Sequence, residues 1–191
     1  MADAARNTDS PDTLPAPATD WSADLTTRTG YAFHVRPITP DDEAALADFF
    51  THVGKEDLRF RFLSAIDHVG HEQLLALLRV DHEHSEHFLA CEIGSGRILA
   101  TAMLVGDDDG LRAEVAVAIR SDFKRRGISW VLLDHVAMFA RAKGLRTLES
   151  IESRDNHQAI DMERERGWTA APCPGDPSAM ILRLTLASPP A

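Results

Sequence analysis

The chain has 191 residues, of which 44% are hydrophobic and 26% charged, a length and composition that predict one globular domain with a sizeable core. Its formal net charge is −10, from 30 acidic and 20 basic residues. That balance argues against general nucleic-acid binding, which depends on Lys and Arg to neutralise phosphates, and weakly favours a cationic or amine-bearing partner.

The first stretch of the chain, residues 1–29, is rich in Ala, Asp, Thr and Pro and has no apolar periodicity. A segment of this kind buries too little apolar surface to offset the entropy cost of ordering it. We therefore expect a disordered N-terminal tail over 1–29, most of which is dispensable for stability. Residues 30–187 are expected to form the folded domain.

A strand and two helices are predicted next. Tyr31 to Ile38 alternates enough to form a strand. Thr39 is a suitable helix cap with Pro40 at the first helical position, and a second helical stretch covers about 69–79. The apolar residues that predict the buried faces of the two helices are Ala45, Leu46, Phe49 and Phe50 in the first, and Leu74, Leu75, Leu77 and Leu78 in the second.

Three strands should follow, over 88–93, 97–105 and 111–119. Turn sequences rich in Gly, Ser and Asp separate them, at 94–96 and 106–110. Connections this short join strands that run in opposite directions, so the three strands are predicted to form an antiparallel meander.

The C-terminal half begins with a long predicted helix from about Gly127 to Lys143, whose apolar residues are spaced for one face. Gly144 is placed to end it. The remaining predicted elements are a strand over 147–151, a helix over about 156–166, and strands over 168–171 and 179–186. This order predicts an α/β or α+β fold, with a mixed, mostly antiparallel central sheet flanked by helices.

The most informative segment joins the strand over 111–119 to the long helix. Its basic residues Lys124, Arg125 and Arg126 lead into Gly127, where the helix begins. Such a loop presents unpaired backbone N–H groups and the positive end of a helix dipole to one point, and glycine allows close backbone approach. The pattern favours a phosphate-bearing ligand. The alternative is a basic surface turn before a helix.

This segment, Lys124-Arg125-Arg126-Gly127-Ile128-Ser129, resembles the signature of the GNAT acetyltransferase family. That signature has Arg or Gln, two residues, Gly, one residue, and then Gly or Ala. Lys124 and Ser129 depart from it. The resemblance implies that residues 124–129 bind the pyrophosphate of acetyl-CoA and that the chain has the GNAT fold. No metal is expected.

Two other segments extend the resemblance to about residues 31–186. Asn156, followed by Gly167-Trp168, is similar to a family segment in which the Asn contacts the pantetheine of coenzyme A. The same residues are also suitable for starting and ending a helix. The segments over 35–43 and 58–62 are similar to the acetyltransferase domain of bacterial protein-lysine acetyltransferases. The expected acceptor is a protein lysine or a small amine, and this similarity slightly favours the protein lysine.

The chemistry of acetyl transfer then points to Glu114. A protonated amine cannot attack a thioester, so a general base must remove its proton. Ala113-Glu114-Val115 matches the context of the family's basic Glu. The alternative is a solvent-facing Glu on an alternating strand. The backbone around Val117, Ala118 and Ile119 is implied to bind the cofactor and to polarise its thioester carbonyl.

The general acid is unassigned. Many family members have a Tyr in the helix after the Asn, but the only tyrosine here is Tyr31. Ser153 and His157 are weak candidates because they lie near Asn156 in the sequence. A coenzyme A thiolate is also a tolerable leaving group without protonation. The rival function is therefore a coenzyme A-binding sensor or interaction module that has no turnover.

Other features bear on class and location. The histidines at 82, 84 and 87 do not have the spacing of a closed zinc site, and the setting of Cys91 and Cys173 suggests neither a disulfide framework nor a metal site. No apolar run approaches the roughly 20 residues needed to span a bilayer, and no secretory signal begins the chain. A cytoplasmic enzyme with no membrane or nucleic-acid partner is expected, and a homodimer is left open.

Overall fold

The computed structural model describes residues 21–62 and 68–186, and within them the strands form one eight-stranded sheet in the order β1-β2-β3-β4-β5-β6-β8-β7. Neighbouring strands pair antiparallel except β5 and β6, which are parallel. The strands are β1 (Ala23–Thr26), β2 (Ala32–Pro37), β3 (Ser85–Glu92), β4 (Ile98–Gly106), β5 (Arg112–Ile119), β6 (Thr147–Ser153), β7 (Thr169–Pro172) and β8 (Ala179–Thr185). The predicted mixed, mostly antiparallel sheet is confirmed.

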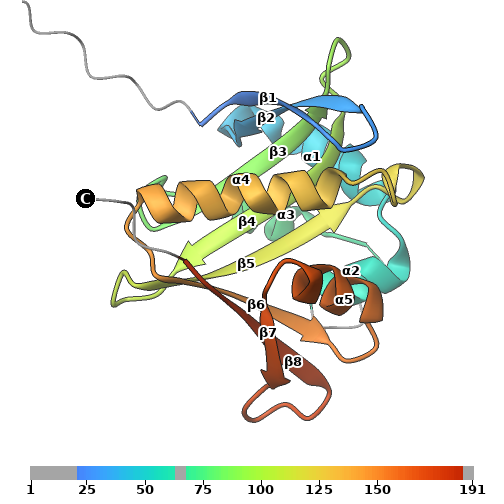
Figure 1. Ribbon diagram of the computed structural model, residues 1–191. Coiled ribbons are helices and arrows are strands. Elements are labelled where there is room, and N and C mark those ends of the chain that lie inside the picture. The colour runs from blue at the N-terminus through green and yellow to red at the C-terminus, as the bar shows by residue number, and fades with distance from the viewer. Residues whose placement is uncertain (1–20, 63–67, 187–191) are drawn as a thin grey trace, which may run out of the picture.

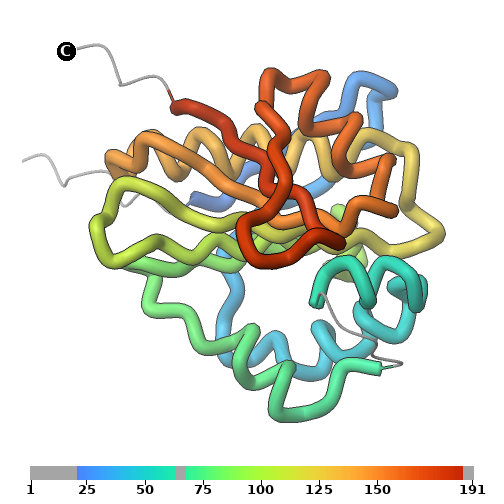
Figure 2. The backbone as a smooth tube through the Cα atoms, turned by 90° about the horizontal axis from the view of Figure 1, so that it is seen from below, coloured from blue at the N-terminus to red at the C-terminus, as the bar shows by residue number. Residues whose placement is uncertain are grey.

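Helices cover both faces of the sheet (Figures 1 and 2). Those on one face pack over a core that includes Leu46, Phe49, Leu58 and Leu74, and those on the other over a core that includes Leu132 and Val136. The first face carries η1 (Pro40–Asp42), α1 (Glu43–Thr51), α2 (Lys55–Phe62) and α3 (His71–Leu78), and the second carries α4 (Ile128–Ala142) and α5 (His157–Glu165). A short helix, η2 (Ser121–Phe123), lies in the loop between β5 and α4.

Alternation along β5 assigns its side chains to these two layers. Ala113 and Val115 lie in the core under α4, whereas Ala118 lies in the core under α1, α2 and α3. Glu114 has the same parity as Ala118 and therefore faces the layer of α1–α3. On β6, Leu148 lies in the core under α4, so Ser150 and Glu152, two and four residues further along the strand, face the layer of α4 and α5.

The expectation of a disordered tail is wrong for residues 21–29. β1 pairs antiparallel with β2, from Ala23 opposite Val35 to Thr26 opposite Ala32. Trp21 packs edge-on against Phe139 of α4, with ring centroids 5.2 Å apart, and its carbonyl accepts a hydrogen bond from His135. A four-residue strand is too short to show periodicity, and the partners of Trp21 lie more than a hundred residues away. Residues 1–20 lie outside the described part.

A chain that begins at Thr27 should unfold at a temperature roughly 5–10 °C below that of a chain that begins at Trp21. The shorter chain lacks β1 and the Trp21 packing, and it leaves one edge of β2 unpaired. Thermal unfolding followed by circular dichroism measures the difference. Equal midpoints would show that β1 contributes nothing to the fold.

The parallel pairing of β5 and β6 is short. It covers only the pairs Arg112–Thr147, Ala113–Leu148 and Glu114–Glu149. Beyond these pairs the two strands diverge, β5 toward the start of α4 and β6 toward α5 (Figure 1). β5 stays paired with β4 as far as Ile119, so its other edge is open over 115–119.

Candidate functional site

A cavity of about 470 Å³ lies where β5 and β6 diverge. Its walls come from β5, β6, the loop into α4, and helices α2 and α5. All the residues that the sequence singled out for the site line it, namely Glu114, Val117, Ala118, Ile119, Lys124, Arg125, Arg126, Gly127, Ile128, Ser129 and Asn156. The structure therefore brings together segments that are separated by 42 positions in the chain.

The loop into α4 has the backbone geometry of an anion site. Gly127 precedes the helix with φ +82°, and Arg125 also has a positive φ, +61°. The first N–H groups of the 15-residue α4 have no acceptor within the helix, and the helix dipole adds partial positive charge at the same end. An anion such as a pyrophosphate is stabilised at such a helix N-terminus.

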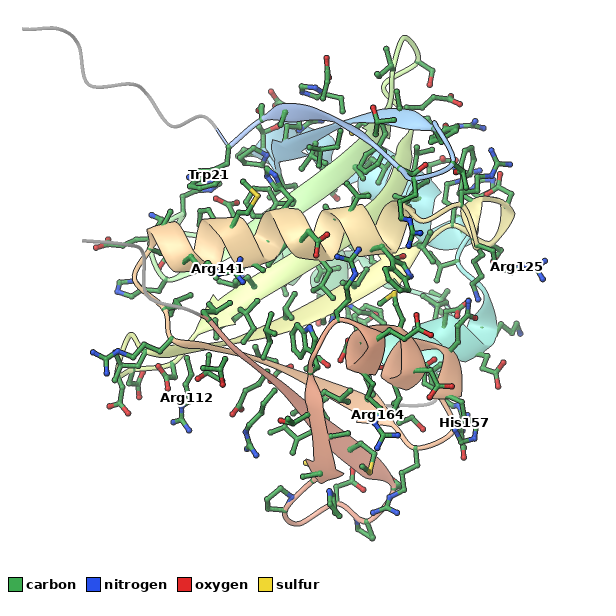
Figure 3. The ribbon with its side chains drawn as sticks, viewed as in Figure 1. Trp21, Arg112, Arg125, Arg141, His157 and Arg164 are labelled. Carbon is green, nitrogen blue, oxygen red and sulfur yellow. The ribbon has the colours of Figure 1, made fainter. Side chains whose placement is uncertain are left out.

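The three cations of the loop differ in their surroundings. Nζ of Lys124 lies 2.6 Å from the carboxylate of Asp57, an ion pair that ties the loop to α2. Arg126 stacks over the ring of Phe123 at 4.4 Å and donates to the carbonyl of Asp122. The side chain of Arg125 extends from the loop away from the domain (Figure 3). The charge of Lys124 is thus partly balanced by Asp57 before any ligand binds.

Glu114 lies on β5 just where pairing with β6 ends. Its side chain is exposed, as expected of a solvent-facing residue on an alternating strand, and it also lines the cavity, within reach of a bound molecule. The open edge of β5 continues from it through Val117, Ala118 and Ile119. In a strand, alternate residues direct their N–H and C=O groups toward the same edge, so this stretch presents unpaired main-chain groups to the cavity.

The sequence analysis missed six charged residues of the cavity. They include Arg61 of α2, Glu152 of β6 and Glu163 of α5, besides Arg28, Asp57 and Arg166. Within the described residues, Nε of Arg61 is buried without a hydrogen-bond partner. Burial lowers the pKa of Arg61, and the charges of Glu114 and Glu152 oppose that shift. Nothing in the local sequence marks these residues, because their enclosure depends on which elements pack around them.

The two carboxyl groups on the β6 and α5 side are held by hydrogen bonds. Oε2 of Glu152 accepts from Nδ2 of Asn156 at 2.7 Å, and Oε2 of Glu163, which is 4% exposed, accepts from Oγ of Ser150 at 2.5 Å. Burial and then the charge of Glu163 raise the pKa of Glu152 to about 8, against the lowering effects of Asn156 and Arg61. Burial raises the pKa of Glu163 to about 7. Glu152 therefore favours the protonated form at neutral pH, whereas Glu163 is close to half ionised there.

These raised pKa values predict that stability falls as pH rises. The folded state favours the neutral carboxyls, so their contribution is fully present below the ordinary Glu pKa and is lost as pH rises through the folded values of about 7 and 8. Glu163→Gln removes one of the two carboxyls, and its melting temperature should therefore exceed that of the wild type increasingly between pH 5 and 8. Glu165→Gln, an exposed site on the same helix, is the control. A constant difference across this range would contradict the assignment.

The other residues considered for the general acid are placed elsewhere. Neither Ser153 nor His157 is among the described residues that line the cavity. Tyr31 packs edge-on against Phe123, with ring centroids 6.0 Å apart. Asn156 does line the cavity, and its Oδ1 also accepts from the backbone N–H of Ala159, so it serves as a helix cap as well.

The histidines at 82 and 84 are each paired with an acidic side chain. His82 contacts Glu86, and His84 contacts Asp81. His87 is buried instead, next to the carbonyl of Leu77. In the part of the chain that the structure describes, no group of three or more His, Cys, Asp or Glu side chains could hold a metal ion, and no helix is both long and apolar enough to cross a bilayer.

Comparisons with known proteins agree on the fold. The model of the acetyltransferase (GNAT) family matches residues 48–168. The acetyltransferase PA5475 of Pseudomonas aeruginosa is 27% identical over 154 residues, which cover 80% of this chain and 83% of that protein. Among solved structures, the GNAT domain of S. lividans PAT superposes with a TM-score of 0.81 at 26% identity, covering 88% of this chain and 98% of that one. The spermidine N-acetyltransferase of Vibrio cholerae in complex with CoA and spermine has a TM-score of 0.65 at 11% identity, over 81% and 95% of the two chains.

Proposed function

Because the chain belongs to the acetyltransferase (GNAT) family, we propose that it transfers an acetyl group from acetyl-CoA to a primary amine. The observation that carries this proposal is the continuity of the cavity. It joins the helix N-terminus at Gly127 to the carboxylate of Glu114 along the open edge of β5. A ligand with a phosphate group at one end and a reactive group at the other fits this arrangement.

The proposal gives each wall of the cavity a role. The pyrophosphate is bound by the N–H groups of residues 124–129, with charge from Arg125 and Arg126. The pantetheine lies along the open edge of β5 at 117–119, with Asn156 on the other side. A main-chain N–H of this edge donates to the thioester carbonyl oxygen, where negative charge develops in the transition state.

Glu114 acts as the general base in this scheme. An amine is protonated at neutral pH, and its nitrogen has no lone pair to attack the thioester until the proton is removed. Glu114 is exposed in the cavity and can accept that proton directly or through one water. No metal is required for these steps.

The acceptor is proposed to be a cation before it reacts. The carboxylate of Glu114, which is exposed in the cavity, favours such an acceptor. A protein lysine is favoured over a small amine by the similarity to the GNAT domain of S. lividans PAT. The reaction is placed in the cytoplasm, where acetyl-CoA is available.

Turnover separates this enzyme from the rival, a coenzyme A-binding module without activity. The protein is incubated with acetyl-CoA and, separately, lysine-containing peptides, polyamines and amino acids, and thiol release and product mass are measured. Calorimetry measures acetyl-CoA binding in parallel. Release of coenzyme A that depends on an amine supports the enzyme, and binding without release from any acceptor supports the module.

A further inference from the structure

The proposed reaction needs a proton for the sulfur that leaves, and the sequence assigns none of its residues to that task. The cavity holds three carboxyl groups besides Glu114, of which Asp57 pairs with Lys124, and Glu152 and Glu163 have no role so far. We infer that Glu152 is the proton donor to the departing coenzyme A thiolate, and that Glu163 is a positioning residue that keeps Glu152 protonated. This inference rests on the proposed function.

Glu152 and Glu114 lie on opposite faces of the sheet. Glu114 is the register partner of Glu149, so both face the layer of α1–α3. Glu152 lies three residues after Glu149 and therefore faces the opposite layer, as does Ser150, which bonds to Glu163 of α5. The cavity reaches both carboxyls because it lies in the gap where β5 and β6 diverge.

This arrangement suits a cofactor and an acceptor that reach the cavity from opposite layers of the fold. The phosphate-binding loop leads into α4, so the cofactor is bound on the side of α4 and α5. The acceptor amine then enters from the side of α1–α3, where Glu114 lies. Glu114, the base, therefore lies on the side of the acceptor amine, and Glu152, the acid, lies on the side of the thioester sulfur.

The hydrogen bond from Asn156 also indicates which carboxyl oxygen of Glu152 carries the acidic proton. Oε2 accepts from Nδ2 of Asn156 at 2.7 Å, so the acidic proton belongs on Oε1. Burial and the neighbouring carboxyl of Glu163 favour retention of that proton. Charged and polar groups from each neighbouring element face the cavity around Glu152. They are Arg61 of α2, Glu114 of β5, Asn156 and Glu163 of the α5 segment, and Arg166. Arg166 is paired with Asp134 of α4.

The step balances as follows. Glu114 takes a proton from the ammonium, and the nitrogen attacks the thioester carbon to give a tetrahedral intermediate. The C–S bond breaks, its electron pair goes to sulfur, and sulfur takes the proton from Oε1 of Glu152. Glu114 releases its proton to water, accepts the second proton from the nitrogen and releases it to water as well, and water returns one proton to Glu152. The sum converts an ammonium and an acetyl thioester to an acetamide, a thiol and one proton.

The test compares wild type, Glu152→Gln and Glu163→Gln by the pH dependence of kcat, with thiol release as the readout. Wild-type kcat should fall as pH rises past the pKa of Glu152, about 8. Glu152→Gln keeps the size of the side chain but has no acidic proton, so kcat should fall by roughly a hundredfold near neutral pH and this alkaline decline should disappear. In Glu163→Gln the alkaline decline should move to lower pH, because the repulsion that holds the proton on Glu152 is gone.

Glu149→Gln is the matched control, since Glu149 is on the same strand but faces the other layer and pairs with Arg183. Its pH profile should equal that of the wild type. A carboxyl-carbon NMR titration of the ligand-free protein supplies a readout that does not depend on turnover, and Glu152 should titrate above neutral pH.

The inference is overturned if Glu152→Gln keeps wild-type kcat and its alkaline decline, or if Glu152 titrates at an ordinary Glu pKa. It is also overturned if Glu152→Gln changes only the melting temperature or the acetyl-CoA dissociation constant, since that is what a structural role produces. Wild-type protein without turnover on any acceptor overturns the proposed function, and this inference with it. Turnover in the wild type with an unaltered Glu152→Gln profile overturns this inference alone.

Discussion

Glu114→Gln should lower kcat by about a hundredfold to ten-thousandfold at neutral pH, the usual contribution of a general base. Gln keeps the size and the hydrogen-bonding capacity of the side chain but has no basic oxygen. The dissociation constant of acetyl-CoA should change by less than about threefold, because the loop at residues 124–129 is untouched and the interaction lost is made only during the chemical step. Steady-state kinetics and calorimetry measure the two quantities.

Raising the pH should partly restore activity to Glu114→Gln, because a larger fraction of the acceptor amine is then neutral without help from the enzyme. Glu149→Gln is again the control, because Glu149 is the register partner of Glu114 and shares its face but does not line the cavity. Its kcat should equal that of the wild type. A Glu114→Gln protein with near-normal kcat over the whole pH range would remove Glu114 from the mechanism and leave the proton to water or to another group.

Gly127→Val should weaken acetyl-CoA binding by at least about tenfold. Gly127 has φ +82°, a left-handed conformation that costs an L-residue roughly 1–2 kcal/mol, so the substitution distorts the loop just where the helix N–H groups begin. Calorimetric titration with acetyl-CoA measures the effect.

Gly144→Val is the matched control for this prediction. Gly144 has φ +85° just beyond the other end of α4, so the substitution has the same backbone cost but lies outside the cavity. Both variants should lose similar amounts of stability, and only Gly127→Val should lose affinity. Equal affinities in the two folded variants would show that the phosphate group binds somewhere other than this loop.

Most elements could be predicted from the sequence because their signals are local. The long helix shows apolar spacing over 15 residues and begins and ends at glycines, and the strands that became β3, β4 and β5 are separated by turn residues. The phosphate loop was found for the same reason, because its cations, its glycine and the helix it starts are consecutive. The boundaries differ from the predicted ones by only a few residues.

The elements that were missed depend on distant partners. β1 is held by β2 and by the contact of Trp21 with Phe139, which no local pattern reveals. α2 was not predicted as a helix because its sequence, from Lys55 to Phe62, is mostly charged, with only Leu58 and Phe60 buried. It nevertheless supplies both Asp57, which pairs with Lys124, and Arg61 of the cavity.

The chemistry of the cavity was predictable to a similar extent. Glu114 could be singled out because it is a lone carboxylate in an apolar strand next to a recognisable motif. Glu152 is one of four glutamates between positions 149 and 165, and the sequence does not tell which of them are enclosed. Enclosure follows from the divergence of β5 and β6 and from the packing of α5, both of which are properties of the assembled sheet.

The segment after β1 also touches the phosphate loop. Oγ1 of Thr29 donates to the carbonyl of Arg126 at 3.3 Å, and a Cβ at Gly127 would lie 3.5 Å from Cβ of Thr27. The free energy that holds β1 in the sheet is therefore linked to the shape of the loop, and linkage is reciprocal. A ligand that fixes the loop makes β1 harder to detach. Conversely, a force on the N-terminus that pulls β1 from the sheet, such as one from a fused domain, raises the dissociation constant of that ligand before the rest of the domain unfolds.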